Sequence, residues 1–170
     1  KEMAAVGKAF EILDEGASAP VGHTLIDAHM VFDIKHDFTR KARLVAGGHM
    51  TDPPASITYA SVVSRESVRI AFLIAALNDL DVLAADIGNA YLNARTKEKV
   101  YIICGKEFGD EYVGRKAVIV RALYGLKSSG AAWRSCLAEV LRDQLEFQPC
   151  RADNDVWLRP SQKPDGSRYY

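Results

Sequence analysis

Two apolar runs decide the fold class: HMVFDIK at residues 29–35 and ARLVA at residues 42–46. Their apolar and β-branched composition predicts two strands, and the short connection between them predicts a hairpin. Four Lys and Arg side chains fall within residues 35–43, so the hairpin carries a basic cluster. Such a cluster is usually a solvated turn, but between two strands it could also hold cations over a phosphate.

The spacing of apolar residues predicts the remaining elements. Residues 64–80 form the clearest helix, with Ser64 as its N-cap, and residues 129–145 form another. Residues 3–13 have a weaker helical spacing. Further strands are expected at residues 82–87, 100–104, 117–120 and 155–158, and a turn at residues 163–166. Because these strands and helices do not alternate regularly, we expect an α+β fold rather than a doubly wound parallel sheet.

The composition is typical of one soluble globular domain. The 170 residues include 22 Lys and Arg against 22 Asp and Glu, and 48% are hydrophobic. No apolar run approaches the roughly 18 residues of a membrane helix, and the first residues lack the pattern of a signal peptide. The zero net charge gives no global argument for nucleic-acid binding, although residues 1–85 are net acidic and residues 86–170 are net basic.

The cysteines and histidines form no recognisable metal or disulfide pattern. Cys104, Cys136 and Cys150 are widely and irregularly spaced, so we expect three separate thiols in a reducing compartment. None of the four histidines pairs with a Glu at the helical spacing of a metal site.

Two segments could carry chemistry. In LAADIGNAYL at residues 83–92, an apolar strand runs into Asp86, whose carboxylate could hold a divalent metal while the following peptides present N–H groups to phosphate oxygens. The alternative for Asp86 is an ordinary turn or N-cap residue. In RALYGLKSSGAAW at residues 121–133, a glycine turn precedes a helix that begins with small residues. Such a segment could admit a ligand, or it could let a helix and a sheet pack tightly.

Three motifs together resemble the reverse transcriptase of Ty1/copia-type retrotransposons: KARLVAGG at residues 41–48, DIGNAYLN at residues 86–93 and ALYGLKSSGAAW at residues 122–133. They have the order and about the spacing of that family, and ADNDVWL at residues 152–158 resembles the strand that follows its palm helix. The resemblance implies a right-hand polymerase fold at residues 26–170, with a fingers β-hairpin and an incomplete palm, an antiparallel sheet backed by two helices. Residues 1–25 would form an N-terminal helix and a loop that leads into the fingers.

The resemblance also implies an activity, the extension of a primer with deoxynucleotides by RNA-directed DNA polymerisation. Two Mg²⁺ ions clamp the attacking and leaving oxygens in such a phosphoryl transfer. Asp86 matches the palm carboxylate that holds both ions, and the carbonyl of Ile87 would be an additional ligand. Asn89 and Ala90 match positions whose backbone N–H groups meet the triphosphate. Tyr91 matches the aromatic gate that excludes a ribose 2′-hydroxyl.

The other residues that match the family would surround the nucleotide and the strands. Tyr124 and Gly125 match the start of the segment that lines the nucleotide pocket. Cations of the fingers hairpin would neutralise the triphosphate, and cations of the third motif would contact nucleic acid: Lys35, Lys41 and Arg43 for the first role, Lys127 and Arg134 for the second. The implied partners are an RNA or DNA template-primer, a deoxynucleotide and the remainder of a Pol polyprotein, with no membrane. The implied location is intracellular, in cytoplasmic particles or in the nucleus.

One departure from the family pattern affects the expected activity. The family's second metal-binding element is a pair of adjacent aspartates, and this sequence contains no Asp-Asp pair. We therefore expect a chain truncated before that hairpin and inactive in isolation. Two alternatives stay open: a decayed, non-catalytic nucleic-acid-binding remnant that uses the basic hairpin, and a small metal-dependent hydrolase in which Asp79 or Asp81 would fold back toward Asp86.

Overall fold

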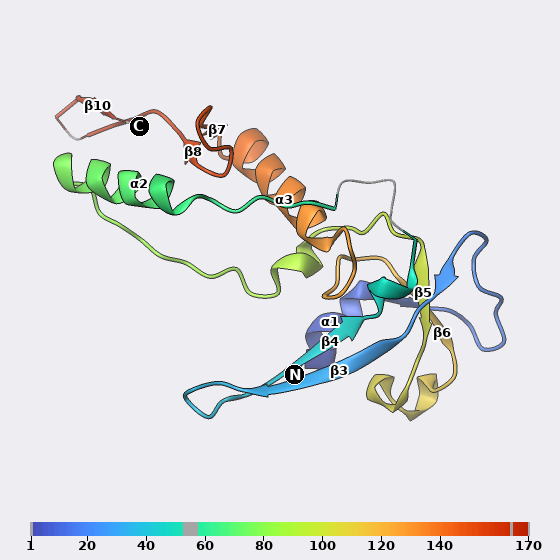
Figure 1. The fold of residues 1–170 in the computed structure, drawn as a ribbon. Coiled ribbons are helices and arrows are strands. Elements are labelled where there is room, and N and C mark those ends of the chain that lie inside the picture. The colour runs from blue at the N-terminus through green and yellow to red at the C-terminus, as the bar shows by residue number, and fades with distance from the viewer. Residues whose placement is uncertain (1, 53–57, 164, 170) are drawn as a thin grey trace. The chain divides into compact units, whose positions relative to one another are not determined.

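The computed structural model describes residues 2–52, 58–163 and 165–169 of the chain (Figure 1). Its internal contacts divide the chain into two units. The first unit comprises Lys1–Tyr59 and Gly88–Arg134, and the second comprises Ala60–Ile87 and Ser135–Tyr170.

The predicted hairpin is confirmed in the first unit, where Figure 1 shows it as a long two-stranded arm. Strand β3 (Ala28–Ile34) pairs antiparallel with β4 (Arg40–Ala46), from Ala28 opposite Ala46 to Ile34 opposite Arg40. Because successive side chains alternate between the two faces of a strand, Leu44 and Ala46 share the buried face of β4. Lys41 and Arg43 share the other face. The basic cluster therefore extends along β4 and is not confined to the turn.

A four-stranded sheet forms the rest of this unit, in the order β1-β6-β5-β2. The β2–β5 pair is parallel, and the other two pairs are antiparallel. The bounds are β1 (Phe10–Ile12), β2 (Thr24–Leu25), β5 (Val100–Ile103) and β6 (Lys116–Ile119). The last two confirm the strands predicted at residues 100–104 and 117–120.

The predicted helix at residues 3–13 is wrong in its second half. Helix α1 (Glu2–Val6) and a 3-10 turn (Gly7–Ala9) lead directly into β1. In β1, Phe10 is buried and Glu11 is exposed, so the side chains alternate with the period of a strand. Pairing of β1 with β6 at the sheet edge outweighs the weak helical spacing of this segment.

The core of the first unit lies between this sheet, α1 and the base of the hairpin. Its largest fully buried side chains come from the sheet, from β4 and from neighbouring loops: Ile26, Leu44, Ile102, Ile119, Leu123 and Cys104. Phe10 and Phe108 meet edge to face, with ring centroids 5.1 Å apart. Burial raises the pKa of the Cys104 thiol. Cys104, Cys136 and Cys150 form no disulfide with one another.

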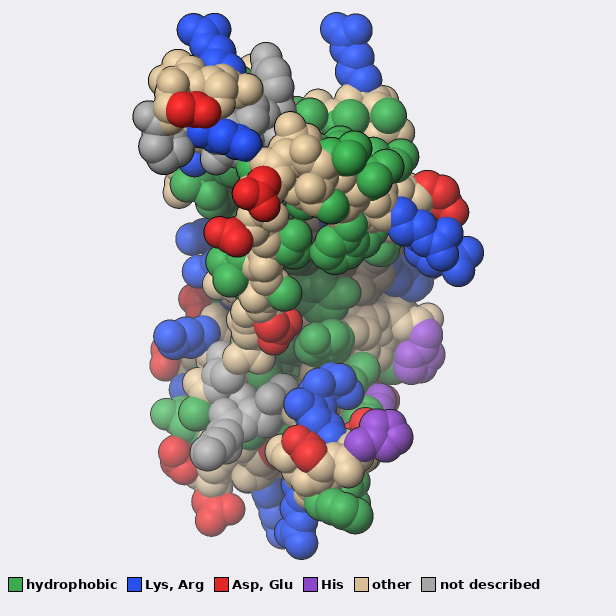
Figure 2. All heavy atoms as spheres, turned by 90° about the vertical axis from the view of Figure 1, so that its left-hand side faces the viewer, with side chains coloured by type: hydrophobic (Ala, Val, Ile, Leu, Met, Phe, Trp, Pro, Cys, Tyr) green, Lys and Arg blue, Asp and Glu red, His purple; other side chains and the backbone are tan. Residues whose placement is uncertain are grey.

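In the second unit, helix α2 (Arg65–Leu77) confirms the predicted helix but ends three residues earlier than expected. Ser64 caps it as predicted, because its side-chain oxygen accepts a hydrogen bond from the Ser67 N–H at 3.0 Å. No residue of α2 is buried. Figure 2 shows hydrophobic side chains gathered over the upper part of one face, where α2 lies; the exposed side chains include Ile70, Phe72, Leu73, Ile74 and Leu77.

The predicted strand at residues 82–87 is wrong. This segment forms no regular element, and all of its side chains are exposed. A strand requires a hydrogen-bonded neighbour, and no strand of the described residues pairs with this one. The apolar run that leads to Asp86 is thus an unpaired connection between α2 and the first unit's 3-10 turn at Ala90–Asn93.

The predicted C-terminal helix is confirmed, and of the strand predicted at residues 155–158 only residues 157 and 158 form one. Helix α3 (Ser129–Glu139) continues into a π-helical turn (Val140–Gln144), which together match the predicted helix at residues 129–145. Two small antiparallel pairs follow: β7 (Gln148–Pro149) with β8 (Trp157–Leu158), and β9 (Ser161–Gln162) with β10 (Arg168–Tyr169). The Lys163 N–H donates to the Ser167 carbonyl at 2.8 Å across the predicted turn, of which residue 164 lies outside the described residues.

Helices and mixed sheets together confirm the α+β class. Among the described residues, no helix is long and apolar enough to cross a membrane.

Candidate nucleotide site

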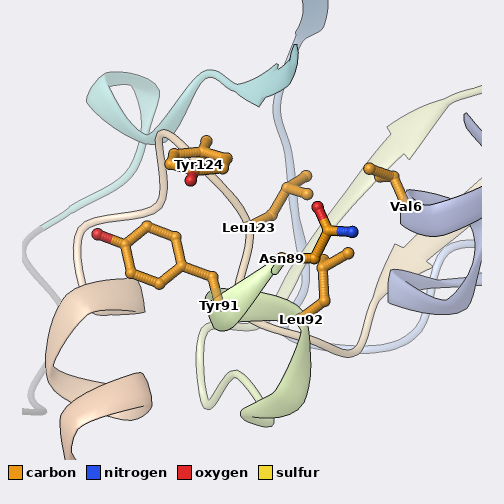
Figure 3. A pocket seen from close by; sticks show the side chains of 6 residues that line it. All are labelled: Val6, Asn89, Tyr91, Leu92, Leu123 and Tyr124. Carbon is orange, nitrogen blue, oxygen red and sulfur yellow. The ribbon is translucent and has the colours of Figure 1, made fainter. Parts of the chain in front are cut away.

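Residues of the second and third motifs meet at a pair of tyrosine rings in the first unit (Figure 3). Tyr91 lies in the 3-10 turn Ala90–Asn93, and Tyr124 lies in the loop before α3. Their ring centroids are 4.9 Å apart, with the ring planes tilted by 53°. The Arg43 guanidinium of the hairpin lies over the Tyr124 ring, 5.7 Å from its centroid. Cation–π attraction and aromatic packing therefore link all three motifs.

A small pocket opens beside these rings. It is lined by Val6, Asn89, Tyr91, Leu92, Leu123 and Tyr124. Asn89 precedes the 3-10 turn with a positive φ of 52°, a left-handed conformation that Asn tolerates better than most residues. Its carbonyl accepts the Leu92 N–H at 2.9 Å, which closes the turn. The pocket thus combines apolar walls with an amide and two phenol groups.

The loop that carries Tyr124 is held against the base of the hairpin by backbone contacts. The Ala46 N–H donates to the Tyr124 carbonyl at 2.7 Å. Gly125 has a φ of +93°, and a Cβ there would lie 1.9 Å from the Ala46 carbonyl oxygen. A Cβ on Gly48 would lie 2.2 Å from the Gly125 carbonyl oxygen. The close approach that glycine permits at position 125 is therefore to another backbone, which favours the packing alternative for this glycine.

Three polar residues to which the sequence assigned no role of their own fix the same loop. The Ser129 hydroxyl donates to the Leu123 carbonyl at 2.7 Å and accepts the Leu123 N–H at 3.0 Å. The Glu98 carboxylate, only 9% exposed, accepts hydrogen bonds from the Ser128 N–H at 2.8 Å and from the Ser128 hydroxyl at 2.6 Å. Glu98 lies 30 residues before Ser128, so no local pattern could have revealed this contact.

The predicted cations occupy different surroundings. Lys41 and Arg43 are half-buried on one face of β4, whereas Lys35 is exposed in the hairpin turn. The Lys127 ammonium donates to the Thr51 carbonyl, which ties it to the chain that follows the hairpin. Arg134 lies half-buried in α3. Arg43 thus lies beside the tyrosine pair, whereas the Lys127 ammonium is hydrogen-bonded to the protein's own backbone at Thr51.

Asp86 and Ile87 belong to the second unit, in the extended segment that follows α2, and both are exposed. Across the described ranges, no group of three or more His, Cys, Asp or Glu side chains could hold a metal ion. A site for two Mg²⁺ ions needs several carboxylate oxygens around them, and Asp86 with the Ile87 carbonyl would supply only part of such a set. Among the residues that the structure describes, Asp79 and Asp81 form no such group with Asp86.

Comparisons with known proteins agree with the motifs. The family described as reverse transcriptase (RNA-dependent DNA polymerase) matches residues 11–164. The chain therefore belongs to the reverse transcriptase family. It is 33% identical over 134 residues to the Gag-Pol polyproteins of the transposons Ty1-NL2, Ty1-BL and Ty1-DR4 of Saccharomyces cerevisiae, which confirms the resemblance to the Ty1/copia type.

These matches cover 75% of this chain but only 7–8% of each polyprotein. No solved structure matches the chain.

Proposed function

We propose that the chain is the nucleotide-binding part of a retrotransposon RNA-directed DNA polymerase, with residues 26–170 forming its fingers and part of its palm. The observation that carries this proposal is the cluster of Tyr91, Tyr124 and Arg43, because it joins three separate family motifs beside one pocket. A deoxynucleoside triphosphate fits the chemistry of this cluster: aromatic rings for its sugar and base, and cations for its phosphates.

In this proposal, Tyr91 is the sugar gate. Its ring is half-buried and packs on Tyr124, so it has little freedom to move away from a ligand. A ribose 2′-hydroxyl would collide with the ring, whereas a deoxyribose would not. Tyr124 would line the same pocket, and Gly125 would hold the Tyr124 loop against the hairpin beside it. The N–H groups of Asn89 and Ala90 would face the triphosphate. Its negative charge would be balanced by the hairpin cations Lys35, Lys41 and Arg43.

Polymerisation requires more than nucleotide binding. Reverse transcriptases generally use Mg²⁺, and the proposal gives Asp86 and the Ile87 carbonyl one side of such a site. Since the described residues hold no cluster that fits two ions, the 170-residue chain is expected to bind nucleotide without extending a primer. Lys127 and Arg134 would contact the template-primer, and the remainder of a Pol polyprotein would supply the missing ligands.

The proposal is tested by measuring the affinity of the purified chain for dUTP and for UTP, which differ only in the 2′-hydroxyl. The wild-type chain should bind dUTP more tightly. Tyr91→Ala should bring the two affinities together, while Tyr91→Phe, which keeps the ring, should retain the preference. Equal affinity of the wild-type chain for both nucleotides would contradict the sugar gate.

A second candidate, the non-catalytic nucleic-acid-binding remnant, is favoured by the hairpin tip. Phe32 and Phe38 are 75% and 87% exposed there, next to Lys35 and Arg40. Exposed aromatic rings among cations are suited to stacking bases of a single strand. This candidate predicts salt-sensitive retention of single strands that is lost in the Lys41→Ala/Arg43→Ala variant. Binding that does not depend on salt would exclude it.

A further inference from the structure

The segment that leads into β5 presents its side chains alternately outward and inward. Arg95, Lys97 and Lys99 are exposed. Of the residues between and after them, Thr96 is half-buried, and Glu98 and Val100 are buried. Three cations thus point to solvent from every second position of a five-residue stretch.

Hydrogen bonds fix the inward-facing residues Thr96 and Glu98, and this keeps the three cations before, between and after them on the outer side. The Glu98 carboxylate accepts from the Ser128 N–H and hydroxyl at 2.8 and 2.6 Å. The Thr96 hydroxyl accepts the Glu98 N–H at 3.1 Å, and the Thr96 N–H donates to the Val120 carbonyl at 3.4 Å. Because Glu98 is committed to Ser128, its negative charge faces away from the three cations.

A fourth cation completes the group. Arg121 pairs with Arg95 in an isolated antiparallel bridge, so two guanidinium-bearing residues lie directly opposite each other. Like charges in this relation destabilise a strand pair. Within the described ranges, the side chains of Arg95, Lys97 and Lys99 make no hydrogen bond or ion pair that would offset the repulsion. An anion placed over the pair would remove this unfavourable interaction.

We propose that these four residues, Arg95, Lys97, Lys99 and Arg121, form a basic ridge that binds the phosphodiester backbone of a single nucleic-acid strand. From Arg95 to Lys99 the extended chain covers up to about 13 Å. This distance is longer than a single phosphate group, so one phosphate cannot contact all three cations. A polyanion with a charge about every 3.4 Å along each strand meets all of them. None of the four belongs to the basic hairpin or to the residues that the family motifs predicted to contact nucleic acid.

The position of the ridge in the first unit favours a nucleic acid over an acidic protein. The Arg121 guanidinium donates to the Asn93 carbonyl at 3.2 Å, at the end of the 3-10 turn that carries Tyr91. Arg95 follows that turn by two residues. The ridge therefore begins beside the pocket assigned above to a nucleotide, so this choice of partner rests on the proposed function. A strand on the ridge would run toward that pocket.

The test is fluorescence-anisotropy binding of a labelled 20-residue oligothymidylate to the full 170-residue chain over a range of NaCl concentrations. The triple variant R95Q/K97Q/K99Q should bind at least about tenfold more weakly at low salt, and the slope of log K against log salt should fall in magnitude by about 2. The matched control is K8Q/K106Q/R69Q, which removes three other exposed cations and should leave affinity and slope near those of the wild-type chain. Equal losses in both variants would overturn the proposal, as would a ridge variant that binds like wild type.

Two further measurements distinguish a single strand from other polyanions and distinguish the ridge from the nucleotide pocket. Polyglutamate that displaces the strand as well as unlabelled oligothymidylate does would identify an acidic-protein surface and overturn the proposal, and so would tighter binding of the annealed duplex. Affinity for dTTP, measured on the same samples, should be equal in the ridge variant and the wild-type chain. Ridge-dependent strand binding by a chain that does not bind dTTP would refute the proposed function while supporting the ridge.

Discussion

Asp153 accepts a hydrogen bond from the backbone N–H of Ser64, 89 residues earlier in the chain, at 3.0 Å. The same carboxylate oxygen accepts from the Ser67 hydroxyl at 2.7 Å, and its other oxygen accepts from the Asp155 N–H at 3.0 Å. The first turn of α2 is thus joined to the loop that precedes β8. This contact organises the second unit, in which α2 has no buried residue.

The first prediction concerns the pH dependence that Asp153 creates. The backbone hydrogen bond from Ser64, with those from Ser67 and Asp155, lowers the pKa of the Asp153 carboxyl from 3.8 to about 2. Because the folded pKa lies below the unfolded value, this stabilisation is complete above pH 3.8 and is lost as the pH falls toward 2. Asp153→Asn should flatten the dependence of the melting temperature on pH in this window. Asp110→Asn, at an exposed carboxylate, is the control. Identical pH curves for wild type and Asp153→Asn would contradict the prediction.

The second prediction concerns the buried Glu98. Glu98→Ala leaves the Ser128 N–H buried without its acceptor, which should lower the free energy of unfolding by about 1–3 kcal/mol in urea titration. Glu98→Gln keeps an oxygen that can accept both hydrogen bonds and should be less destabilising. Amide exchange should accelerate at Ser128 in the Ala variant alone. Equal destabilisation by the two variants would show that the charge, and not the acceptor, is what matters.

The third prediction concerns Gly125. Gly125→Ala combines a φ of +93° with a Cβ that would overlap the Ala46 carbonyl, so it should destabilise the chain by more than about 2 kcal/mol. Gly7→Ala is the matched control, because no atom lies within 4 Å of its Cβ position and its φ is not positive. Urea unfolding of both variants measures the difference. A Gly125→Ala variant as stable as Gly7→Ala would refute the packing described for this loop.

The fourth prediction concerns the tyrosine pair. The side chains of Tyr91 and Tyr124 should contribute jointly to stability, because their ring centroids are only 4.9 Å apart. The free energies of unfolding of the wild-type chain, of Tyr91→Leu, of Tyr124→Leu and of the double variant form a double-mutant cycle. This cycle should give an interaction energy of about 0.5–1.5 kcal/mol between the two rings. Additive effects of the two substitutions would mean that the rings contribute independently.

The sequence predicted those elements in which local signals and tertiary contacts agree. The hairpin of β3 and β4 follows from two apolar runs and a turn, and the start of α2 follows from Ser64, whose capping bond is local. Residues 82–87 have the composition of a strand, but a strand also needs a pairing partner, which local sequence does not specify. Phe10–Ile12 is the reverse case, where pairing with β6 turns a weak helical pattern into a strand.

The residues of the candidate site likewise fall into those that the sequence identified and those that it missed. Tyr91, Tyr124 and Arg43 were identified through family motifs, and the structure brings them together. Glu98 and Ser129 were missed because their partners are fixed by the folded loop, and a single Glu or Ser carries no spacing signal. The outward cations at residues 95, 97 and 99 were equally hidden, since only the burial of Glu98 shows which way they point.

The contact of Gly48 and Gly125 with the base of the hairpin has a mechanical consequence. Backbone meets backbone there without intervening side chains, and the Ala46 N–H is bonded to the Tyr124 carbonyl. Side chains can change rotamer to absorb a displacement, but tightly packed peptide groups cannot. We therefore expect the base of the hairpin and the loop that carries Tyr124 to move as one body when a ligand binds to the charged side of the hairpin.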